Sequence, residues 1–182
     1  MSQLSMEKPR SPAQWLRLYR LYRSAFPREE RKPFSVIVRM YRTGKTDVWC
    51  ICRDKRVLGM VSTVNGGNLV LLDYFAVDRA CRGQGLGSEA LAMVQQIYAG
   101  QGLFAEIEST RELAPNRALR LRRKEFYIRG GMEPLNVFAD VFGVKMELLG
   151  SRCRIDFAGY RSFYEVHYSP WAAKHILPDT SE

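Results

Sequence analysis

The chain has few cysteines and few histidines, and both scarcities exclude classes of protein. Its 182 residues include four cysteines and two histidines. The cysteines lack the spacing of a disulfide framework, and two histidines leave too few ligands for a zinc site. We therefore expect free thiols and no bound metal.

A long hydrophobic segment is also missing. No apolar run approaches the roughly 20 residues that cross a bilayer, and residues 1–10 contain no apolar stretch typical of a secretory signal. We therefore expect no membrane association and a cytoplasmic location. With 46% hydrophobic residues, 26% charged residues and no repeat or linker, residues 1–182 are predicted to form a single domain.

The balance of charge is strongly basic. There are 28 Lys and Arg residues against 19 Asp and Glu residues, which gives a formal net charge of +9. Nucleic acid or a cofactor with several phosphates would both suit this charge, and the cofactor needs fewer basic residues. The densest basic run, residues 117–124, would spread around most of a helix, so we expect most of it to be solvated surface and expect no nucleic-acid partner.

The most informative segment covers residues 69–91. An apolar run from Leu69 to Val77 predicts a buried strand, a short basic and glycine-rich turn follows, and helical periodicity begins at Leu86. Glycine lets the backbone approach an anion closely, and the free N–H groups and positive dipole end of a helix attract it. A ligand that carries phosphate groups is therefore predicted to bind at this corner.

The glycine spacing separates the known phosphate-binding motifs. Residues 83–88 lack the last glycine of the Gly-x-Gly-x-x-Gly motif, and the first glycine of a P-loop is missing before residues 44–46. Residues 82–87 instead have the spacing Arg-x-x-Gly-x-Gly. Between an apolar strand and an amphipathic helix, this pattern resembles motif A of the GNAT superfamily of acetyl-CoA-dependent N-acetyltransferases.

The resemblance covers residues 12–149 and leaves residues 150–182 as an unmatched C-terminal extension. It implies acetyl-CoA as co-substrate, with the strand backbone along the pantetheine and the turn around the diphosphate. The residues that it implies for cofactor binding are Phe75, Val77, Arg82, Gly83, Gln84, Gly85, Leu86, Gly87, Ser88 and Asn116.

The order of the predicted elements is that of an α/β (α+β) chain with the GNAT fold. We expect a twisted, mixed and mostly antiparallel sheet flanked by helices, with one parallel strand–helix–strand unit for the cofactor. The first short strand usual in that fold is not recognised in the sequence. Predicted helices cover residues 12–26, 33–42, 86–99, 115–129 and 156–168, and predicted strands cover residues 47–52, 56–64, 69–77, 103–109, 135–142 and 144–149.

Acyl transfer from a thioester needs a proton donor for the departing thiolate. Residues 126–132 resemble the second signature of the family, which implies that Tyr127 is the general acid. A phenol with a pKa of about 10 can donate to a thiolate whose conjugate acid has a pKa of about 8.5. The alternative is a packing aromatic at the end of a helix.

The amine needs a carboxylate to bind its ammonium form and to accept a proton. Glu106 and Glu108 lie two residues apart on one predicted strand and so project from the same face, and Asp73 lies on a neighbouring strand. Either glutamate could line the pocket for the amine. The alternative is that one of them forms a salt bridge with Arg111 or with the basic helix. Asp73, in an apolar strand, needs a partner or a role.

The sequence thus predicts an N-acetyltransferase that moves the acetyl group of acetyl-CoA to a primary amine. The acceptor would be a small molecule or a peptide, and acidic side chains favour a cationic one. A non-catalytic acyl-CoA-binding regulator and a basic nucleic-acid-binding module are the alternatives. The oligomeric state, a homodimer included, is left open.

Overall fold

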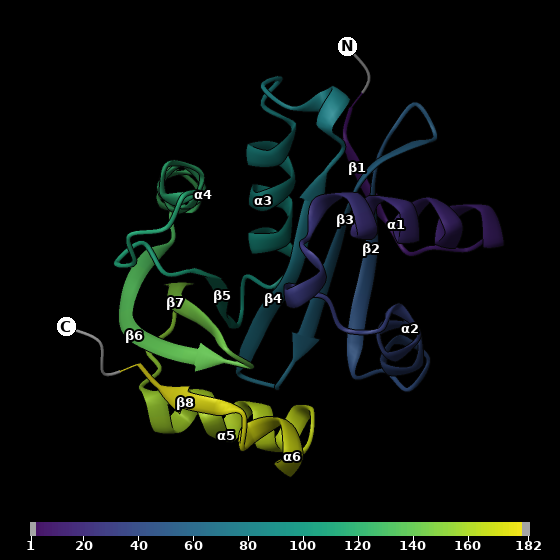
Figure 1. The fold of residues 1–182 in the computed structure, drawn as a ribbon. Helices are drawn as coiled ribbons and strands as arrows, with labels where there is room; N and C mark the ends of the chain where they lie inside the picture. The colour runs from purple at the N-terminus through teal and green to yellow at the C-terminus, as the bar shows by residue number, and fades with distance from the viewer. Residues whose placement is uncertain (1–2, 180–182) are drawn as a thin grey trace. The chain divides into compact units, whose positions relative to one another are not determined.

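The computed structural model describes residues 3–179, which separate into two compact units (Figure 1). Of the described residues, the first unit comprises residues 3–65 and 72–97, and the second comprises residues 66–71 and 98–179. Strand β4 (Leu69–Val77) begins in the second unit and continues into the first. In the part of the chain that is described, no helix is long and apolar enough to cross a membrane.

The first unit is a helix-covered, antiparallel arrangement of strands in the order β1-β2-β3-β4. Strand β1 pairs with β2, and β2 pairs with β3, both antiparallel. The elements, besides β4, are β1 (Ser5–Glu7), α1 (Pro12–Ala25), α2 (Phe34–Arg42), β2 (Thr46–Arg53), β3 (Arg56–Asn65) and α3 (Leu86–Ile97), with short 3-10 turns at Arg28–Glu30 and Arg79–Cys81.

Helix α1 begins where its sequence predicts. The hydroxyl of Ser11 accepts a hydrogen bond from the backbone N–H of Gln14, whose side chain bonds back to the Ser11 N–H, and Pro12 occupies the first turn. Leu18 and Tyr22 on its inner face are almost fully buried. The helix therefore packs through the face that periodicity predicts.

An aromatic cluster around Tyr22 and Tyr74 forms part of the core of the first unit. The two rings meet edge to face with centroids 4.8 Å apart, and Phe26 meets Tyr74 at 4.9 Å. The Tyr22 hydroxyl donates to the carbonyl of Lys32, and the Tyr74 hydroxyl donates to the carbonyl of Glu30. The loop between α1 and α2 is thereby fastened to β4.

The second unit contains an antiparallel sheet in the order β5-β7-β6-β8. Residues 69–71 of β4 belong to this unit, and β4 is the neighbour of β5 and parallel to it. The elements are β5 (Gly102–Glu108), α4 (Arg117–Arg129), β6 (Glu133–Val141), β7 (Val144–Ser151), α5 (Phe157–His167), α6 (Pro170–Ala173) and β8 (Ile176–Pro178).

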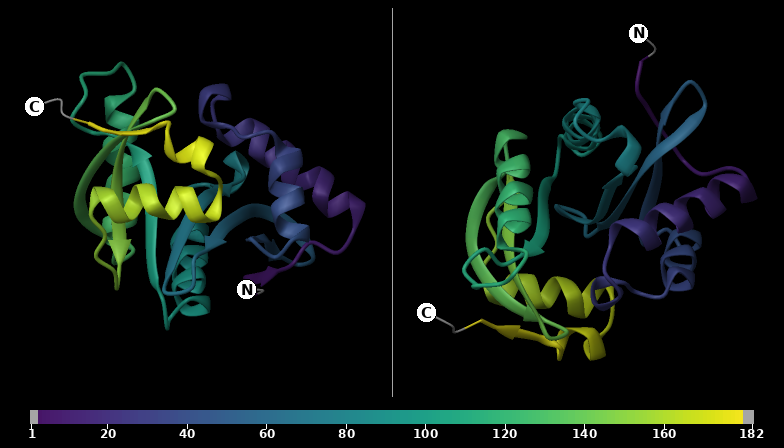
Figure 2. Two further views of the ribbon diagram at one scale, coloured as in Figure 1. Left: turned by 90° about the horizontal axis from the view of Figure 1, so that it is seen from below. Right: turned by 45° about the horizontal axis from the view of Figure 1, so that its top comes forward.

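The C-terminal extension is an integral part of the second unit. Helix α5 lies against the sheet (Figure 2), where the rings of Tyr160 and Phe163 pack on Phe104 of β5. Strand β8 pairs with residues 139–141 of β6. The helix is predicted from its aromatic spacing, whereas α6 and β8 are too short for a periodic pattern.

The predicted fold class is confirmed, with an addition at the N-terminus besides α6 and β8. Strand β1, which the sequence did not reveal, pairs with residues 50–52 of β2. Three residues carry no alternation strong enough to identify a strand. Its pairing with β2, rather than its own sequence, therefore defines it.

Gly59 of β3 provides a test of the packing beneath β4. A Cβ at this position would lie 2.6 Å from the carbonyl oxygen of Ala76 and 2.8 Å from a side-chain carbon of Ile51. Gly59→Ala should therefore lower the free energy of unfolding by about 1–3 kcal/mol, because a backbone oxygen must move. Gly100→Ala is the control in urea denaturation, since a Cβ there has no neighbour within 4 Å; equal stability of the two variants would contradict the expectation.

Candidate active site

The predicted phosphate corner has an open backbone geometry. After β4 and the turn Arg79–Cys81, Gly83 and Gly85 adopt φ angles of +78° and +77°, and α3 begins at Leu86. These angles favour glycine. A Cβ at either glycine would meet nothing within 4 Å, so the turn leaves its backbone accessible.

Six successive backbone N–H groups line this corner. Within residues 3–179 none of them donates a hydrogen bond to the protein, and the first helical bond runs from Glu89 to the carbonyl of Gly85. The first N–H groups of a helix have no intrahelical acceptor, and the helix dipole adds positive potential there. The corner can therefore bind an anionic group. The six residues are Gly83, Gln84, Gly85, Leu86, Gly87 and Ser88.

Side chains hold the corner from the β4 side. The guanidinium of Arg82 donates to the carbonyl of Val77 at 3.3 Å, so this side chain folds back on the end of the strand. Asp78 accepts from the N–H of Ala80 and pairs with Arg17, and these contacts, in that order, lower the pKa of its carboxyl. Phe75 and Val77 are half-buried, and their predicted backbone contacts with a cofactor stay predictions.

Asp73 has the partner that a carboxylate in an apolar strand needs. Its side chain is 7% exposed, and the ammonium of Lys32 lies 2.6 Å from a carboxylate oxygen. Lys32 comes from the loop between α1 and α2, which the Tyr22 and Tyr74 hydroxyls fasten. The sequence predicted the need for a partner and not its identity.

Glu106 and Glu108 receive different kinds of donor. The hydroxyls of Tyr160 and Tyr164 donate to one oxygen of Glu106 at 2.6 and 2.8 Å, and Tyr164 lies 3.1 Å from the other oxygen. Glu108 instead pairs with Arg120 and Arg123 of α4, each at 3.1 Å. The alternative in which one carboxylate pairs with the basic helix is therefore confirmed for Glu108.

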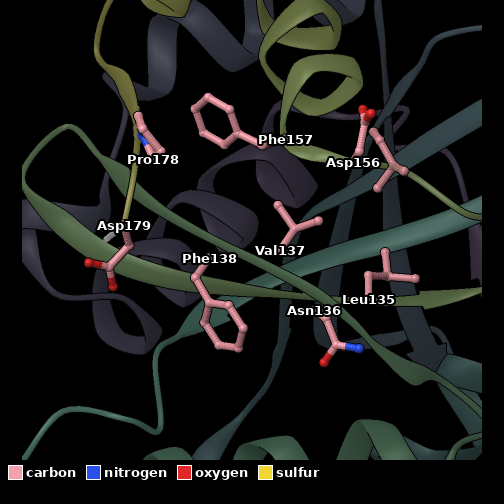
Figure 3. A pocket seen from close by; sticks show the side chains of 9 residues that line it. Leu135, Asn136, Val137, Phe138, Asp156, Phe157, Pro178 and Asp179 are labelled. Carbon is pink, nitrogen blue, oxygen red and sulfur yellow. The ribbon is translucent and has the colours of Figure 1, made fainter. Parts of the chain in front are cut away.

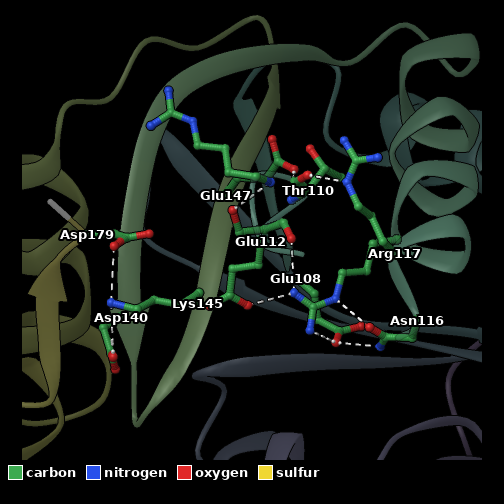
Figure 4. A network of polar contacts seen from close by, with 12 residues as sticks. Glu108, Thr110, Glu112, Asn116, Arg117, Asp140, Lys145, Glu147 and Asp179 are labelled. Carbon is green, nitrogen blue, oxygen red and sulfur yellow. Dashed lines mark hydrogen bonds and ion pairs between the residues drawn. The ribbon is translucent and has the colours of Figure 1, made fainter. Parts of the chain in front are cut away.

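Asn116 belongs to the network around Glu108 (Figure 4). Its amide nitrogen donates to Glu108 at 3.1 Å, and its oxygen accepts from Arg120 at 2.9 Å. Arg120 also donates to the carbonyl of Ser109 and pairs with Glu112. Asn116 thus connects the start of α4 to the end of β5, and its predicted contact with the cofactor stays a prediction.

A buried carboxylate that sequence reasoning missed lies beside this network. Glu147 of β7 is 2% exposed, accepts the N–H of Thr110 at 2.8 Å and pairs with Lys124 at 2.5 Å. A lone acidic residue between Met146 and Leu148 was the available signal. The expectation of solvated surface is wrong for Arg120 and Lys124, which pair with acidic side chains and are 11% and 22% exposed. Arg123 also pairs with Glu108 but stays 39% exposed.

Lys145 forms a second ionic contact on β7 (Figure 4). Its ammonium lies 3.1 Å from Asp179 and 3.5 Å from Asp140, and the hydrogen bond that it donates to Asp179 is the main cause of its raised pKa. This contact ties the segment after β8 to the sheet.

Tyr127 lies in the last turn of α4 and is 7% exposed. Burial raises the pKa of its phenol to about 12, against the opposing charge of Arg123. Among the hydrogen bonds of residues 3–179, none is made by its hydroxyl. The phenol is therefore a protonated donor that can bond a ligand.

The second unit also contains a cavity of about 330 Å³ between β6, the start of α5 and the segment after β8 (Figure 3). Leu135, Val137 and Phe157 contribute apolar walls, and Asp156 and Asp179 contribute carboxylates. None of the predicted site residues lines it. In the described part of the chain, no group of three or more His, Cys, Asp or Glu side chains is placed to hold a metal ion.

Comparisons with solved structures show the fold. A GNAT-family protein from Bacteroides thetaiotaomicron matches 91% of this chain and 98% of its own, with a TM-score of 0.76 and 18% identity. An aminoglycoside 6'-N-acetyltransferase in complex with coenzyme A matches 85% and 99%, with a TM-score of 0.66 and 16% identity. NAA60 of Arabidopsis thaliana in complex with acetyl-CoA matches 82% and 98%, with a TM-score of 0.64 and 15% identity.

The sequence itself shows the family. No curated protein matches the chain. The sequence model of the acetyltransferase (GNAT) family matches residues 15–124, more than half of the chain, and includes the phosphate corner and most of α4. The chain belongs to the GNAT family of acetyltransferases and is an acyl-transferring enzyme.

Proposed function

We propose that this enzyme moves the acetyl group of acetyl-CoA to a primary amine by direct attack of the amine on the thioester. The observation that carries the proposal is the row of six N–H groups at residues 83–88 without protein acceptors, in a chain of the GNAT family. Two similar structures, the aminoglycoside enzyme and NAA60, hold coenzyme A and acetyl-CoA.

The corner suits a diphosphate in both charge and shape. Amides from Gly83 to Ser88 would bond the phosphate oxygens, and the Ser88 hydroxyl would add one more donor. The N–H of Arg82, which the sequence also predicts to bind the diphosphate, donates to the carbonyl of Arg79 instead. The two glycines with positive φ leave open space at the turn. The backbone groups of Phe75 and Val77 would bond the amides of the pantetheine, as an added strand does.

The phenol of Tyr127 would stabilise the departing thiolate. With a pKa of about 12, it is protonated at neutral pH. A thiol has a pKa of about 8.5, so complete transfer of the proton from the phenol to the thiolate is unfavourable. The role that fits this difference is a hydrogen bond to the sulfur, strengthened by the low dielectric of a buried site.

Among the three predicted carboxylates, Glu106 is the one that we assign to the amine. Asp73 and Glu108 are bonded to cationic side chains, which they would have to exchange for a substrate ammonium. The hydroxyls of Tyr160 and Tyr164 donate to Glu106, and hydrogen bonds of this kind stabilise the charged form of a carboxylate. A carboxylate in this state favours a cationic amine, on a small molecule or a peptide, and Asp73 and Glu108 would shape its surroundings.

Ser88→Asp tests the diphosphate site without weakening the helix. An acidic residue in the first turn of a helix is favourable by about 0.3–1 kcal/mol, so thermal stability should be kept or rise. Repulsion of the diphosphate should lower the affinity for acetyl-CoA at least about tenfold in calorimetric titrations. Ser88→Ala is the control and should lose far less affinity for acetyl-CoA. An unchanged affinity of Ser88→Asp would exclude this binding site.

Tyr127→Phe tests the role of the phenol. We expect kcat to fall by about 100-fold, the scale of losing one hydrogen bond to a developing negative charge, with little change in the affinity for acetyl-CoA. Release of the coenzyme A thiol, measured across a panel of amines, provides kcat, and calorimetry provides the affinity. Full turnover by this variant would leave Tyr127 as a packing residue.

The raised pKa of Tyr127 also sets a pH dependence of stability. The folded pKa of about 12 exceeds the ordinary value of 10, so folding favours the neutral phenol. Its contribution is fully present below pH 10 and is lost as the pH rises from 10 through 12. In urea denaturation at pH 9, 10 and 11, the stability of the native protein should decline relative to Tyr127→Phe. A constant difference between the two proteins would show that the phenol titrates normally.

A further inference from the structure

Two tyrosines of the C-terminal extension hold one carboxylate of the sheet. Tyr160 and Tyr164, one turn apart on α5, both donate to Glu106 of β5, at 2.6 and 2.8 Å. Both side chains are almost fully buried, with exposures of 0% and 2%. Buried hydroxyls need acceptors, and both have theirs in the same carboxylate.

Packing fixes where the two hydroxyls lie. The ring of Tyr160 meets Phe104 edge to face at 6.3 Å and meets Tyr164 at 5.4 Å. Tyr164 stacks on Tyr168 at 4.8 Å. Rings that are packed on several sides cannot turn without disturbing the core. The oxygens of Glu106 are therefore held by donors whose positions the core determines.

The kind of donor matters for the carboxylate. Hydrogen bonds to a carboxylate stabilise its charged form. At Asp73 and Glu108, a substrate ammonium would have to displace Lys32 and Arg120 from their ion pairs. At Glu106 the hydroxyls of Tyr160 and Tyr164 orient the carboxylate and favour its charged form.

We propose that Tyr160 and Tyr164 are positioning residues for the acceptor amine and act through Glu106. The inference rests on the proposed function, in which Glu106 binds the amine. It gives α5 a supporting role in catalysis. This helix lies outside residues 15–124, the part of the chain that matches the family model. The extension is then part of the machinery that prepares the amine, in addition to its place in the fold.

The step that these residues support is the loss of a proton from the ammonium. Glu106 takes one proton from the bound ammonium and later releases it to solvent. The amine nitrogen forms a bond to the acetyl carbon, and the C–S bond breaks with its electron pair on sulfur. The second proton of the nitrogen leaves as the amide forms and ends on the sulfur, which gives the coenzyme A thiol.

The double variant Tyr160→Phe/Tyr164→Phe keeps both rings and removes both donors. We expect kcat/KM for the amine to fall about 10- to 100-fold, while the dissociation constant for acetyl-CoA stays within about twofold. Tyr168→Phe, which removes a hydroxyl from the same aromatic row, is the control and should keep kcat/KM within about twofold. A double variant with the amine kcat/KM of the native enzyme would overturn the inference.

The variant Glu106→Gln distinguishes a failure of this inference from a failure of the proposed function. If Glu106→Gln keeps full activity, the assignment of Glu106 to the amine is wrong. If it loses activity while the tyrosine variants do not, only the positioning role is wrong. Adding the two Tyr→Phe changes to Glu106→Gln should cause no further loss, because residues that act through one group are not additive.

A folding defect would be recognised separately. It would lower the melting temperature and the affinity for acetyl-CoA together, whereas a positioning role changes the amine kcat/KM alone. If the double variant does not fold, Tyr160→Phe and Tyr164→Phe are measured singly. Each should then show a smaller loss for the amine, and two unaffected single variants would overturn the inference.

Discussion

A carboxylate can be buried in a sheet only when it is given partners, and this constraint organises much of the molecule. Asp73, Glu106, Glu108 and Glu147 all lie on strands and are shielded from solvent to different degrees. Each obtains its partners from an element outside its own strand. Those contacts hold the α1–α2 loop to β4 in the first unit, and α4 and α5 to the sheet in the second.

The partners also divide the carboxylates by chemistry. Cationic partners at Asp73, Glu108 and Glu147 make ion pairs, which fasten segments together. A buried ion pair is costly to break, because one charge is then left without compensation. Glu106, with its tyrosine hydroxyls, is the one that we assign to substrate. Catalysis and structural support thus use the same residue type in different surroundings.

The phosphate corner depends on backbone rather than on side chains. Its donors are N–H groups at a helix start, and its accessibility comes from two glycines with positive φ. Such a site is encoded by residues adjacent in the chain, so its pattern can be recognised from the sequence alone. The same holds for α1, whose capping residues Ser11 and Gln14 stand three positions apart, and for α5, with its aromatic spacing.

The sequence by itself determined the family, the order of the main helices and strands, the phosphate corner and the candidate carboxylates, because each depends on neighbours along the chain. That residues 1–182 form a single domain stays a prediction. Only the tertiary structure decided which partner each carboxylate has, since Lys32 and Asp73 are 41 positions apart and Tyr160 and Glu106 are 54. It also decided the raised pKa of Tyr127, because burial results from packing that no local pattern records. Contacts between distant segments have no signature in a single sequence, and the short strands β1 and β8 exist only through them.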